Sequence, residues 1–371
     1  SSFVKPIFGA DRIIVSLAMV LGAVVLGTRL GWQDYWWDEH VTLTFTRSGW
    51  RELLVDYWAL DTHRPVYYAL QKGWNELFGE SVAAVRALPV FVTLLTVPVF
   101  FVIARQIRQG SLAALVVLLL VSTPAFVYQG REIRMYCLLN LSLSVALMFL
   151  VILATRAQAG QSGISRKTAL QWIGCSVALA IAFYAHAIAA FVAVLFGLWI
   201  LLAVVLRLLP PNFLWQALIA GVLFGLLIVP GILPFIWHFG GTLGESFWIP
   251  DPSFDYIYGQ MAAVYAYPKW GKLLFGILLM WGFWSLRRRP LICLLLAFIV
   301  IGFPLMVLLF SFYKPIFMTR VVAWSGFVSV LVLAAGLMNM RRAWRWACIL
   351  LLLISQTVAL INFYPATPER S

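Results

Sequence analysis

Charged residues are scarce in this sequence: they make up 11% of its 371 residues, whereas a soluble domain has about a quarter. Hydrophobic residues make up 63%, and apolar runs of about 20 residues, long enough to cross a bilayer, recur along the whole chain. Strand-like alternation between short turns is absent, and lipid admits only helices or closed barrels. The sequence therefore predicts an all-α polytopic membrane protein rather than a soluble globular one.

Cysteine is also rare, with four residues in the chain. Each lies inside an apolar run, and their spacing fits neither a metal site nor a disulfide framework. The first apolar run follows Lys5 and Arg12, as in a signal peptide, but it has no convincing small-residue cleavage site and further spans follow. We therefore expect an uncleaved first helix. The cysteines are Cys137, Cys175, Cys293 and Cys348.

The apolar runs predict eleven membrane spans. They show no internal repeat, and no connection between them has the composition of a soluble domain. We therefore expect a single transmembrane domain over residues 1–371, with two long polar connections at 32–82 and 238–271. The predicted spans lie near residues 12–31, 83–104, 111–128, 134–155, 168–186, 187–206, 213–237, 272–286, 290–312, 317–339 and 344–363.

The charges divide unevenly between the two ends of these spans. With the N-terminus placed in the cytoplasm, about half of the 27 lysines and arginines fall in the inner connections, but only Asp11 of the 14 acids does. An excess of lysine and arginine in short loops marks the cytoplasmic side, so the net charge of +13 indicates topology rather than nucleic-acid binding. The inner basic residues are Lys5, Arg12, Arg105, Arg108, Arg156, Arg166, Lys167, Arg207, Arg287, Arg288, Arg289, Arg341, Arg342 and Arg345.

The first outer loop contains two adjacent acids, Asp38 and Glu39, followed by two amphipathic stretches, 42–60 and 67–78. Apolar residues recur in each stretch at helical spacing, which is typical of helices that lie in the membrane interface. We therefore expect two interfacial helices that hold the acids near the membrane surface, with Ser81 capping the next span. The apolar positions are Trp50, Leu53, Leu54, Tyr57 and Trp58, then Tyr67, Leu70, Trp74, Leu77 and Phe78.

Five segments carry a resemblance to a known group: "WWDEH", "HRPVYYALQKGWNELFGESVAAVRALP", "YQGREIRMYCLL", "FYAHAIAAF" and "YKPIFMTRVVAW". In this order, over roughly residues 30–325, the chain resembles the protein O-mannosyltransferase and lipid A aminoarabinose transferase superfamily of GT-C-type glycosyltransferases. The resemblance implies an inverting enzyme that moves a sugar from a polyprenyl phosphate to an outer acceptor. One departure is Val321, where relatives commonly have tyrosine after the arginine that matches Arg320.

The resemblance implies that Asp38 is the catalytic acidic residue and Glu39 its partner. A carboxylate suits the removal of a proton from the acceptor hydroxyl, and Glu39 would raise the proton affinity of Asp38, orient it or hold the acceptor. Alternatively, both carboxylates pair with arginines such as Arg51 or Arg64 and serve only the structure. Cationic side chains suit the leaving phosphate. The expected phosphate-binding residues are Arg131, Arg134, Lys314 and Arg320, and the expected substrate contacts are His63, Arg64, Tyr136 and His186.

No metal or other cofactor is expected. Asp38, Glu39 and the outer histidines offer possible ligands, but no pair has the i, i+4 spacing of a helical metal site, and adjacent carboxylates usually point apart. The second long outer connection, 238–271, is rich in glycine, proline and aromatic residues. Loops of this length are often functional, and aromatic faces suit sugar rings or lipid chains. We expect it to cover the site.

Two other functions fit a polytopic chain with outer charges. A transporter or flippase of a lipid-linked sugar would show internal symmetry and charges at the membrane midplane. An oligosaccharide ligase or polymerase would use a lipid diphosphate on the same scaffold. The clustering of charges at one face favours a glycosyltransferase in a bacterial inner membrane, with a cytoplasmic N-terminus and an extracytoplasmic site. The acceptor stays open among lipopolysaccharide, other cell-envelope glycans, glycolipids and proteins.

Overall fold

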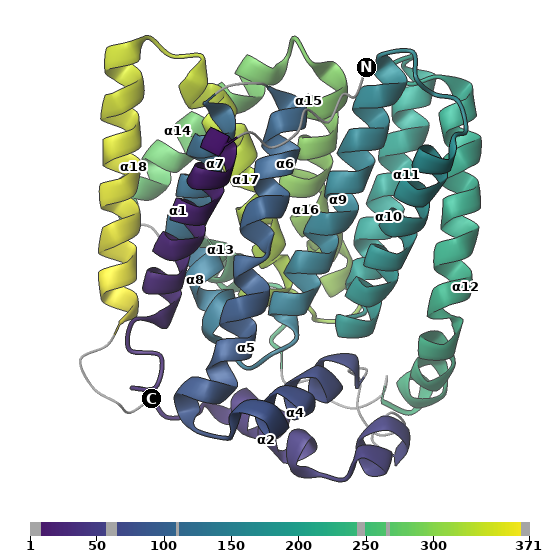
Figure 1. The fold of residues 1–371 in the computed structure, drawn as a ribbon, viewed down its shortest axis with the longest axis vertical. Helices are drawn as coiled ribbons and strands as arrows, with labels where there is room; N and C mark the ends of the chain where they lie inside the picture. Colours follow the sequence, from purple (N-terminus) through teal and green to yellow (C-terminus); the bar gives the residue numbers. More distant parts are fainter. Residues whose placement is uncertain (1–8, 57–64, 109–110, 243–248, 265–267, 365–371) are drawn as a thin grey trace.

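The computed structural model describes residues 9–56, 65–108, 111–242, 249–264 and 268–364 of the chain, and the regular elements in these ranges are all helices. The long helices run side by side as a bundle, and two short helices, α2 and α4, lie across one end of it (Figure 1). The elements of the first half are α1 (Gly9–Gly27), α2 (Trp37–Arg47), the π-helical turn η1 (Glu52–Asp56), α4 (Val66–Phe78), α5 (Val82–Leu94), α6 (Thr96–Ile107), α7 (Leu112–Ser122), α8 (Pro124–Arg131) and α9 (Tyr136–Gln158).

The second half of the chain completes the bundle (Figure 1). Its helices α10, α11 and α12 lie together on the side of the bundle opposite α18. These elements are α10 (Arg166–Ala185), α11 (Ala189–Val205), α12 (Pro211–Thr242), α13 (Phe254–Val264), α14 (Lys269–Leu286), α15 (Pro290–Ala297), the π-helical turn η2 (Phe298–Gly302), α16 (Phe303–Ser311), α17 (Thr319–Met338) and α18 (Arg342–Phe363).

The number of candidate membrane spans is lower than predicted. Within the described residues, eight helices are long and apolar enough to cross a membrane, and α7 with α8, which are bent by 55° relative to each other, make a ninth if they count as one span. The eleven predicted spans are therefore not confirmed, although each predicted range overlaps a helix. One reason is that α11 has 17 residues. The other is that Lys269 and Lys272 reduce the hydropathy of α14.

Most of the described basic residues assigned to the inner side lie at or next to the last turns of α6, α9, α11 and α14 or the first turns of α10 and α18, and these helix ends lie at the end of the bundle away from α2 and α4 (Figure 1). Asp11, the single acid assigned there, lies 3.5 Å from the guanidinium of Arg105. Arg108 donates to the side-chain oxygen of Asn339 at 3.2 Å. These contacts join the ends of helices that are far apart in sequence. Charges that the sequence assigned to the inner side therefore meet at one end of the bundle.

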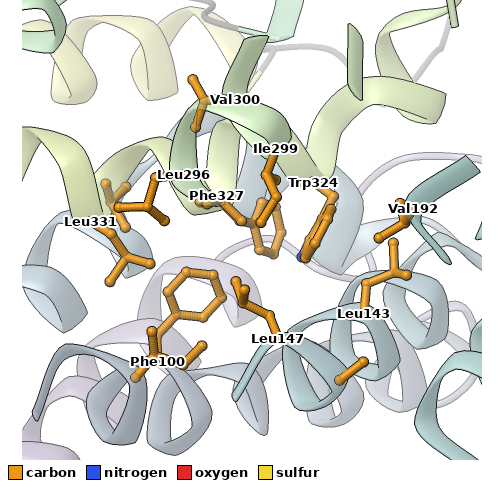
Figure 2. Packing of buried hydrophobic residues seen from close by; sticks show 14 of the residues in the cluster. Phe100, Leu143, Leu147, Val192, Leu296, Ile299, Val300, Trp324, Phe327 and Leu331 are labelled. Carbon is orange, nitrogen blue, oxygen red and sulfur yellow. The ribbon is translucent and has the colours of Figure 1, made fainter. Parts of the chain in front are cut away.

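Helix α17 forms the centre of the bundle, since 94% of its span is buried inside the protein. Figure 2 shows Trp324, Phe327 and Leu331 of α17 among apolar side chains from other helices. These include Phe100 of α6, Leu147 of α9, and Leu296 and Ile299 of the span that contains η2. Because α17 is fixed on all sides, its first turn is a rigid support for the residues placed there.

Helices α14 and α17 approach closely because glycines face each other. A Cβ atom on Gly282 would lie 2.3 Å from the carbonyl oxygen of Val332, and one on Gly336 would lie 2.9 Å from the backbone of Gly282. Small residues of this kind let helix backbones touch in membrane proteins, where packing rather than the hydrophobic effect drives association. The contact fixes α17 along its inner half.

The two helices across the end of the bundle differ in detail from the prediction. Helix α2 begins at Trp37, before the predicted amphipathic stretch, and residues 52–56 form the π-helical turn η1. The face of α4 that packs on the protein includes Tyr67 and the polar Gln71, whereas three residues of its predicted apolar stripe are exposed: Leu70, Leu77 and Phe78. Leu70, Leu77 and Phe78 therefore face outward, as expected at a membrane interface, whereas Tyr67, the first residue of the predicted stripe, is buried. Tyr57 and Trp58 lie outside the described residues.

The start of α5 agrees with the prediction. Ser81 precedes the helix, and its side-chain oxygen accepts a hydrogen bond from the backbone N–H of Ala84 at 3.3 Å. This N-cap satisfies one of the free donors of the first helical turn.

Candidate active site

Two adjacent carboxylates begin helix α2, at the end of the bundle opposite the basic connections. Asp38 and Glu39 lie in its first turn, where the positive end of the helix dipole favours negative charge. Trp36 precedes the helix in an extended conformation, and its backbone N–H donates to the Glu39 carboxylate at 3.3 Å. Successive helical residues point about 100° apart, so the two carboxylates reach different parts of the protein.

Glu39 is fully enclosed and forms a two-point ion pair with Arg86 of α5. The Arg86 Nη2 and Nε atoms donate to the two carboxylate oxygens at 2.8 and 3.2 Å, and the exposed fractions of the two side chains are 2% and 0%. The backbone N–H of Ile133 donates to the same carboxylate at 3.3 Å. Glu39 thus ties α2 to α5 and to the segment after α8.

The remaining donors of Arg86 hold the chain that connects α1 to α2. They bond the backbone carbonyls of Gln33 at 2.7 Å, Asp34 at 3.0 Å and Leu30 at 3.1 Å. A buried charge is tolerated when it is both paired and hydrogen-bonded. Arg86 and Glu39 meet that condition, and together they fix the position of the first turn of α2.

Asp38 faces another arginine, Arg320, in the first turn of the buried helix α17. The Arg320 Nη1 atom donates to the Asp38 carboxylate. The exposed fraction is 19% for the Asp38 side chain and 11% for that of Arg320. This pair is therefore partly accessible from outside the protein. The guanidinium also lies 5.2 Å from the ring centre of Trp36 and 5.8 Å from that of Tyr136, which are cation–π distances.

A cavity of about 250 Å³ opens beside Arg320. It lies between α8, α13 and the start of α17. Its polar lining comes from three separate parts of the chain, and alanines and Val264 supply much of the rest. The lining residues are Trp36, Ala125, Tyr128, Gln129, Glu132, Gln260, Ala263, Val264, Met318, Thr319, Arg320 and Ala323.

Helix α13, from the predicted covering loop, is bound to the start of α17 at this cavity. The side-chain oxygen of Gln260 accepts hydrogen bonds from the Thr319 backbone N–H at 2.7 Å and from its hydroxyl at 2.8 Å. The phenol of Tyr256 donates to the carbonyl of Phe317 at 2.9 Å. Burial raises the pKa of Tyr256 above its ordinary value, while the charge of Arg320 lowers it, so the phenol stays protonated and able to donate.

The predicted cations occupy different surroundings. Arg134 is buried and donates to the backbone carbonyl of Asp38 at 3.3 Å and to the hydroxyl of Thr42 at 3.2 Å. Arg131 donates instead to carbonyls at the end of α1, including those of Leu26 at 2.8 Å and Arg29 at 3.1 Å. The structure therefore places Arg320 and Arg134 at Asp38, and Arg131 at the end of α1.

The other predicted site residues are more scattered. Lys314 is buried in the turn between α16 and α17. The ring of Tyr136, at the start of α9, lies 5.6 Å from that of His186, whose Nδ1 accepts the backbone N–H of Ile188 at 3.1 Å. His63 and Arg64 lie outside the described residues.

The sequence-based prediction did not include several residues of this region. Arg86 gave a usable signal, because a lone arginine inside a predicted span calls for an acidic partner. Gln129, Gln260 and Thr319 gave none, because neutral polar residues near span ends are common and their meeting depends on three distant segments.

No group of three or more histidine, cysteine, aspartate or glutamate residues that could hold a metal ion occurs in the described parts of the chain. What this region combines is a carboxylate and a guanidinium in contact, beside a small cavity with polar lining. A carboxylate at such a place accepts protons, and a guanidinium binds phosphate.

Comparison with known proteins gives one family match. Residues 50–242, just over half of the chain, match the family model described as dolichyl-phosphate-mannose-protein mannosyltransferase. The matched segment contains α4, Arg86 and Gln129, and ends at the last residue of α12. No curated protein sequence matches the chain.

Several solved structures share the fold. ArnT from Cupriavidus metallidurans in the apo state is 15% identical, with a TM-score of 0.67 over 91% of this chain and 61% of that chain. ArnT of the same organism bound to undecaprenyl phosphate is 16% identical, with a TM-score of 0.61 over 97% of this chain and 63% of that one. The chain thus spans about three fifths of the length of these ArnT structures.

A more distant match is the archaeal oligosaccharyltransferase AglB from Archaeoglobus fulgidus, in complex with an inhibitory peptide and a dolichol-phosphate. It is 10% identical, with a TM-score of 0.58 over 95% of this chain and 55% of that chain. At such identities the likeness concerns the fold. These matches confirm an all-helical, polytopic membrane protein with a fold like that of ArnT, as the sequence predicted.

Proposed function

We propose that this chain, which belongs to the dolichyl-phosphate-mannose-protein mannosyltransferase family, is a membrane glycosyltransferase that moves a sugar from a polyprenyl-phosphate donor to an extracytoplasmic acceptor. The observation that carries the proposal is the contact between Asp38 and Arg320 beside a polar cavity. A base for the acceptor and a cation for the leaving phosphate thus lie side by side, at the end of the bundle away from the basic connections.

Asp38 is the proposed general base. Its carboxylate takes the proton of the acceptor hydroxyl while the acceptor oxygen forms a bond to the anomeric carbon. The bond between that carbon and the donor phosphate oxygen breaks, and its electron pair leaves with the lipid phosphate. Attack from the side opposite the leaving group inverts the anomeric centre. Positioned proton transfer of this kind contributes typically about 10²- to 10⁴-fold to the rate.

Arg320 is the proposed partner of the lipid phosphate. Its planar guanidinium suits two-point contact with a phosphate, and fixed positive charge is most effective where water is largely excluded. Because the Arg320 Nη1 atom donates to Asp38, a phosphate bound at Arg320 competes with Asp38 for the guanidinium. Donor binding therefore releases the Asp38 carboxylate to act as a base when a sugar is present to be transferred.

The remaining predicted residues receive supporting roles. Arg134 holds the backbone of Asp38, and Glu39 orients the first turn of α2 through Arg86. Lys314 stays a candidate for the donor phosphate, and Tyr136 packs its ring below the guanidinium of Arg320. We keep His63, Arg64 and His186 as proposed substrate contacts. The proposed reaction needs no metal ion.

The proposed location is a bacterial inner membrane with the N-terminus in the cytoplasm. The arginine-rich end of the bundle would then face the cytoplasm, as expected from the distribution of lysine and arginine, and Asp38 would face outward. The acceptor would be a cell-envelope glycan such as lipopolysaccharide, another glycolipid or a protein. Charges gathered at one end rather than at the midplane favour this reading over a flippase.

Mass spectrometry of lipids that co-purify with the full chain tests the donor class. A polyprenyl monophosphate, alone or carrying one sugar, supports the proposal. A lipid diphosphate with an oligosaccharide would contradict it and favour an oligosaccharide ligase. Glycans from a strain that lacks the protein should then lack one sugar residue of the same mass. Glycans without any missing residue would argue against a transferase.

A further inference from the structure

A second cavity, of about 400 Å³, lies between α9, α10, α11 and α12. The last three of these helices lie together at one side of the bundle (Figure 1). Along α12, which begins at Pro211 at the inner end, the lining extends from Leu214 to Phe224. At about 1.5 Å per residue, this is a depth of roughly 5 to 20 Å from that end. The cavity therefore lies in the inner part of the protein, whereas Asp38 and Arg320 lie at the outer end.

The polar side chains that line this cavity are bonded to the protein itself. The indole N–H of Trp172 donates to the side-chain oxygen of Gln216 at 2.9 Å, and the hydroxyl of Ser176 donates to the carbonyl of Ala220 at 2.8 Å. The thiol of Cys175 also donates to a backbone carbonyl. No lining side chain thus has a buried nitrogen or oxygen without a partner among the described residues. A cavity with such a lining excludes water, so a suitable occupant is apolar.

The cavity opens to the outside of the bundle between α11 and α12. The exposed residues of its lining are Gly197 of α11 and Leu218, Gly221 and Val222 of α12. A Cβ atom on either glycine would meet no other atom within 4 Å, whereas one on Gly282 of α14 would collide with a neighbouring helix. The glycines at the opening therefore leave a gap, and in a membrane this gap faces the acyl chains of lipids.

A basic residue lies at the inner end of the gap. Arg207 is exposed in the turn that connects α11 to α12. It follows Gly197 by ten residues, or roughly 15 Å along a helix. One leaflet supplies half of a hydrocarbon core that is about 30 Å thick. The distance from Arg207 to the opening therefore corresponds to the depth of one leaflet.

Two more basic residues belong to the same end of the cavity. Asn212, at the start of α12, donates to the carbonyl of Ser162, before α10, at 2.9 Å. This contact brings the start of α10, with the exposed Arg166 and Lys167, next to the start of α12. Neither of these residues nor Arg207 forms an ion pair with an acid in the described part of the chain. The positive charge at this end therefore favours an anionic partner.

We propose that this cavity binds one acyl chain of an anionic phospholipid from the inner leaflet, with the lipid phosphate at Arg207. The chain enters between Gly197 and Gly221 and fills the dry cavity. The proposal goes beyond the transfer reaction and takes from the proposed function only the orientation of the protein. The polyprenyl chain of the donor is the competing occupant, but its phosphate is proposed to bind at Arg320, at the opposite end.

The test measures lipid binding to the purified full chain by native mass spectrometry. The probes are phosphatidylglycerol, which is anionic, phosphatidylethanolamine, which is zwitterionic, and undecaprenyl phosphate. We expect phosphatidylglycerol to bind about fivefold more tightly than phosphatidylethanolamine, as expected for one basic residue at an anionic lipid. Phosphatidylglycerol with a diazirine in its acyl chain should crosslink mainly to peptides from α10, α11 and α12.

Variants separate the acyl-chain contact from the headgroup contact. Gly197→Leu places a side chain in the gap and should weaken phosphatidylglycerol binding about tenfold, the change expected when about two buried methylene groups are displaced. It should leave the affinity for undecaprenyl phosphate unchanged. Arg207→Gln should abolish the preference for phosphatidylglycerol over phosphatidylethanolamine.

Two variants on the other side of the bundle are the matched controls. Gly276 of α14 also has no atom within 4 Å of a Cβ position, and Arg341 is exposed before α18 at the inner end. Gly276→Leu and Arg341→Gln should change neither lipid affinity nor preference.

The inference is overturned if Gly197→Leu binds phosphatidylglycerol as the wild type does, because the cavity would then be a packing void. It is also overturned if this variant weakens binding of undecaprenyl phosphate instead, because the donor chain would then be the occupant. Failure of the proposed function looks different: the wild-type chain would not bind undecaprenyl phosphate at all, yet it would still bind phosphatidylglycerol. Arg320→Gln should leave the affinity for phosphatidylglycerol unchanged.

Discussion

Asp38 and Glu39 are neighbours in the sequence, and each forms an ion pair with an arginine, yet the two pairs have different surroundings. The Glu39 pair with Arg86 is sealed, with exposed fractions of 0% and 2%, and two hydrogen bonds join its ends. The Asp38 pair with Arg320 is partly open, with 19% and 11% exposed, and its arginine lines a cavity.

The difference shows how one helical turn supports both structure and chemistry. A sealed pair cannot exchange partners without leaving a charge buried and unpaired, which is costly, so it fixes geometry. An open pair can exchange its arginine for another anion, such as a phosphate. The rigid pair therefore holds the first turn of α2 in place, and the open pair beside it remains available to a substrate.

The largest effect should come from removing the carboxylate of the open pair. Asp38→Asn should reduce sugar transfer by about 10²- to 10⁴-fold, because the amide cannot act as a base, while the protein stays folded. The measurement is the initial rate of transfer of radiolabelled sugar. Asp34→Asn, an exposed acid four residues earlier, is the control and should keep a normal rate. A near-normal rate for Asp38→Asn would remove the base assignment.

Breaking the sealed pair should cost stability. Glu39→Gln leaves the Arg86 charge buried without its counter-ion, which is expected to cost about 3–5 kcal/mol. The measurement is thermal unfolding in detergent. Glu80→Gln breaks an exposed pair with Arg47, whose side chains are 49% and 59% exposed, and should cost under about 1 kcal/mol. Equal losses for the two variants would mean that burial does not distinguish the pairs.

The arginine of the open pair should affect the donor more than the fold. Arg320→Gln should weaken binding of the polyprenyl-phosphate donor about tenfold or more, since hydrogen bonds to charged groups contribute about 1.5–3 kcal/mol. Arg131→Gln is the comparison, because Arg131 bonds the carbonyls at the end of α1. It should lower stability and leave donor affinity close to that of the wild type. The reverse pattern, measured by equilibrium lipid binding, would exchange the two roles.

A third kind of buried polar group lies inside α9, where an amide has no hydrogen-bond partner within the described residues. Asn140 is 1% exposed, and neither atom of its amide has a hydrogen-bond partner in the described part of the chain. Asn140→Leu should therefore raise thermal stability, by about 1 kcal/mol, because it removes an uncompensated buried polar group of similar size. A drop in the unfolding temperature would show that the amide has a bound partner in the membrane.

The smallest expected effect is that of metal removal. Because the proposed chemistry uses a carboxylate and a guanidinium alone, chelation of divalent ions should leave the transfer rate unchanged. The rate is measured before and after dialysis against a chelator. A complete loss that one divalent ion restores would show that the open pair needs a metal as well.

Much of the architecture was predictable from composition and charge. Apolar runs indicated the helices, the arginine distribution separated the two ends, and the ordered motifs indicated the family. The number of spans was less predictable, because α11 and α14 are too short or too polar to count by length and hydropathy. The 55° bend between α7 and α8 has a local signal in Pro124, at the first turn of α8, because a proline interrupts a helix and disfavours helical backbone at the preceding residue; the prediction of one straight span over 111–128 did not use it.

The site was predictable in its parts but not in its pairings. The sequence motifs pointed to Asp38, Glu39 and Arg320, and the alternative prediction was that both carboxylates pair with arginines of the same loop. The pairs form with α5 and α17 instead, because the 100° turn between adjacent helical residues sends the two carboxylates to different neighbours. The cavity beyond Arg320 needs α8, α13 and α17 to meet, which no local pattern encodes.

The division of roles between the two pairs is tested most directly by measuring unfolding temperature and single-turnover transfer on the same preparations of Asp38→Asn and Glu39→Gln. We expect Asp38→Asn to keep the wild-type unfolding temperature and to lose transfer. We expect Glu39→Gln to unfold at a lower temperature, while its folded fraction transfers sugar at a rate within about tenfold of the wild type. Loss of transfer in a fully stable Glu39→Gln, together with activity in Asp38→Asn, would contradict it.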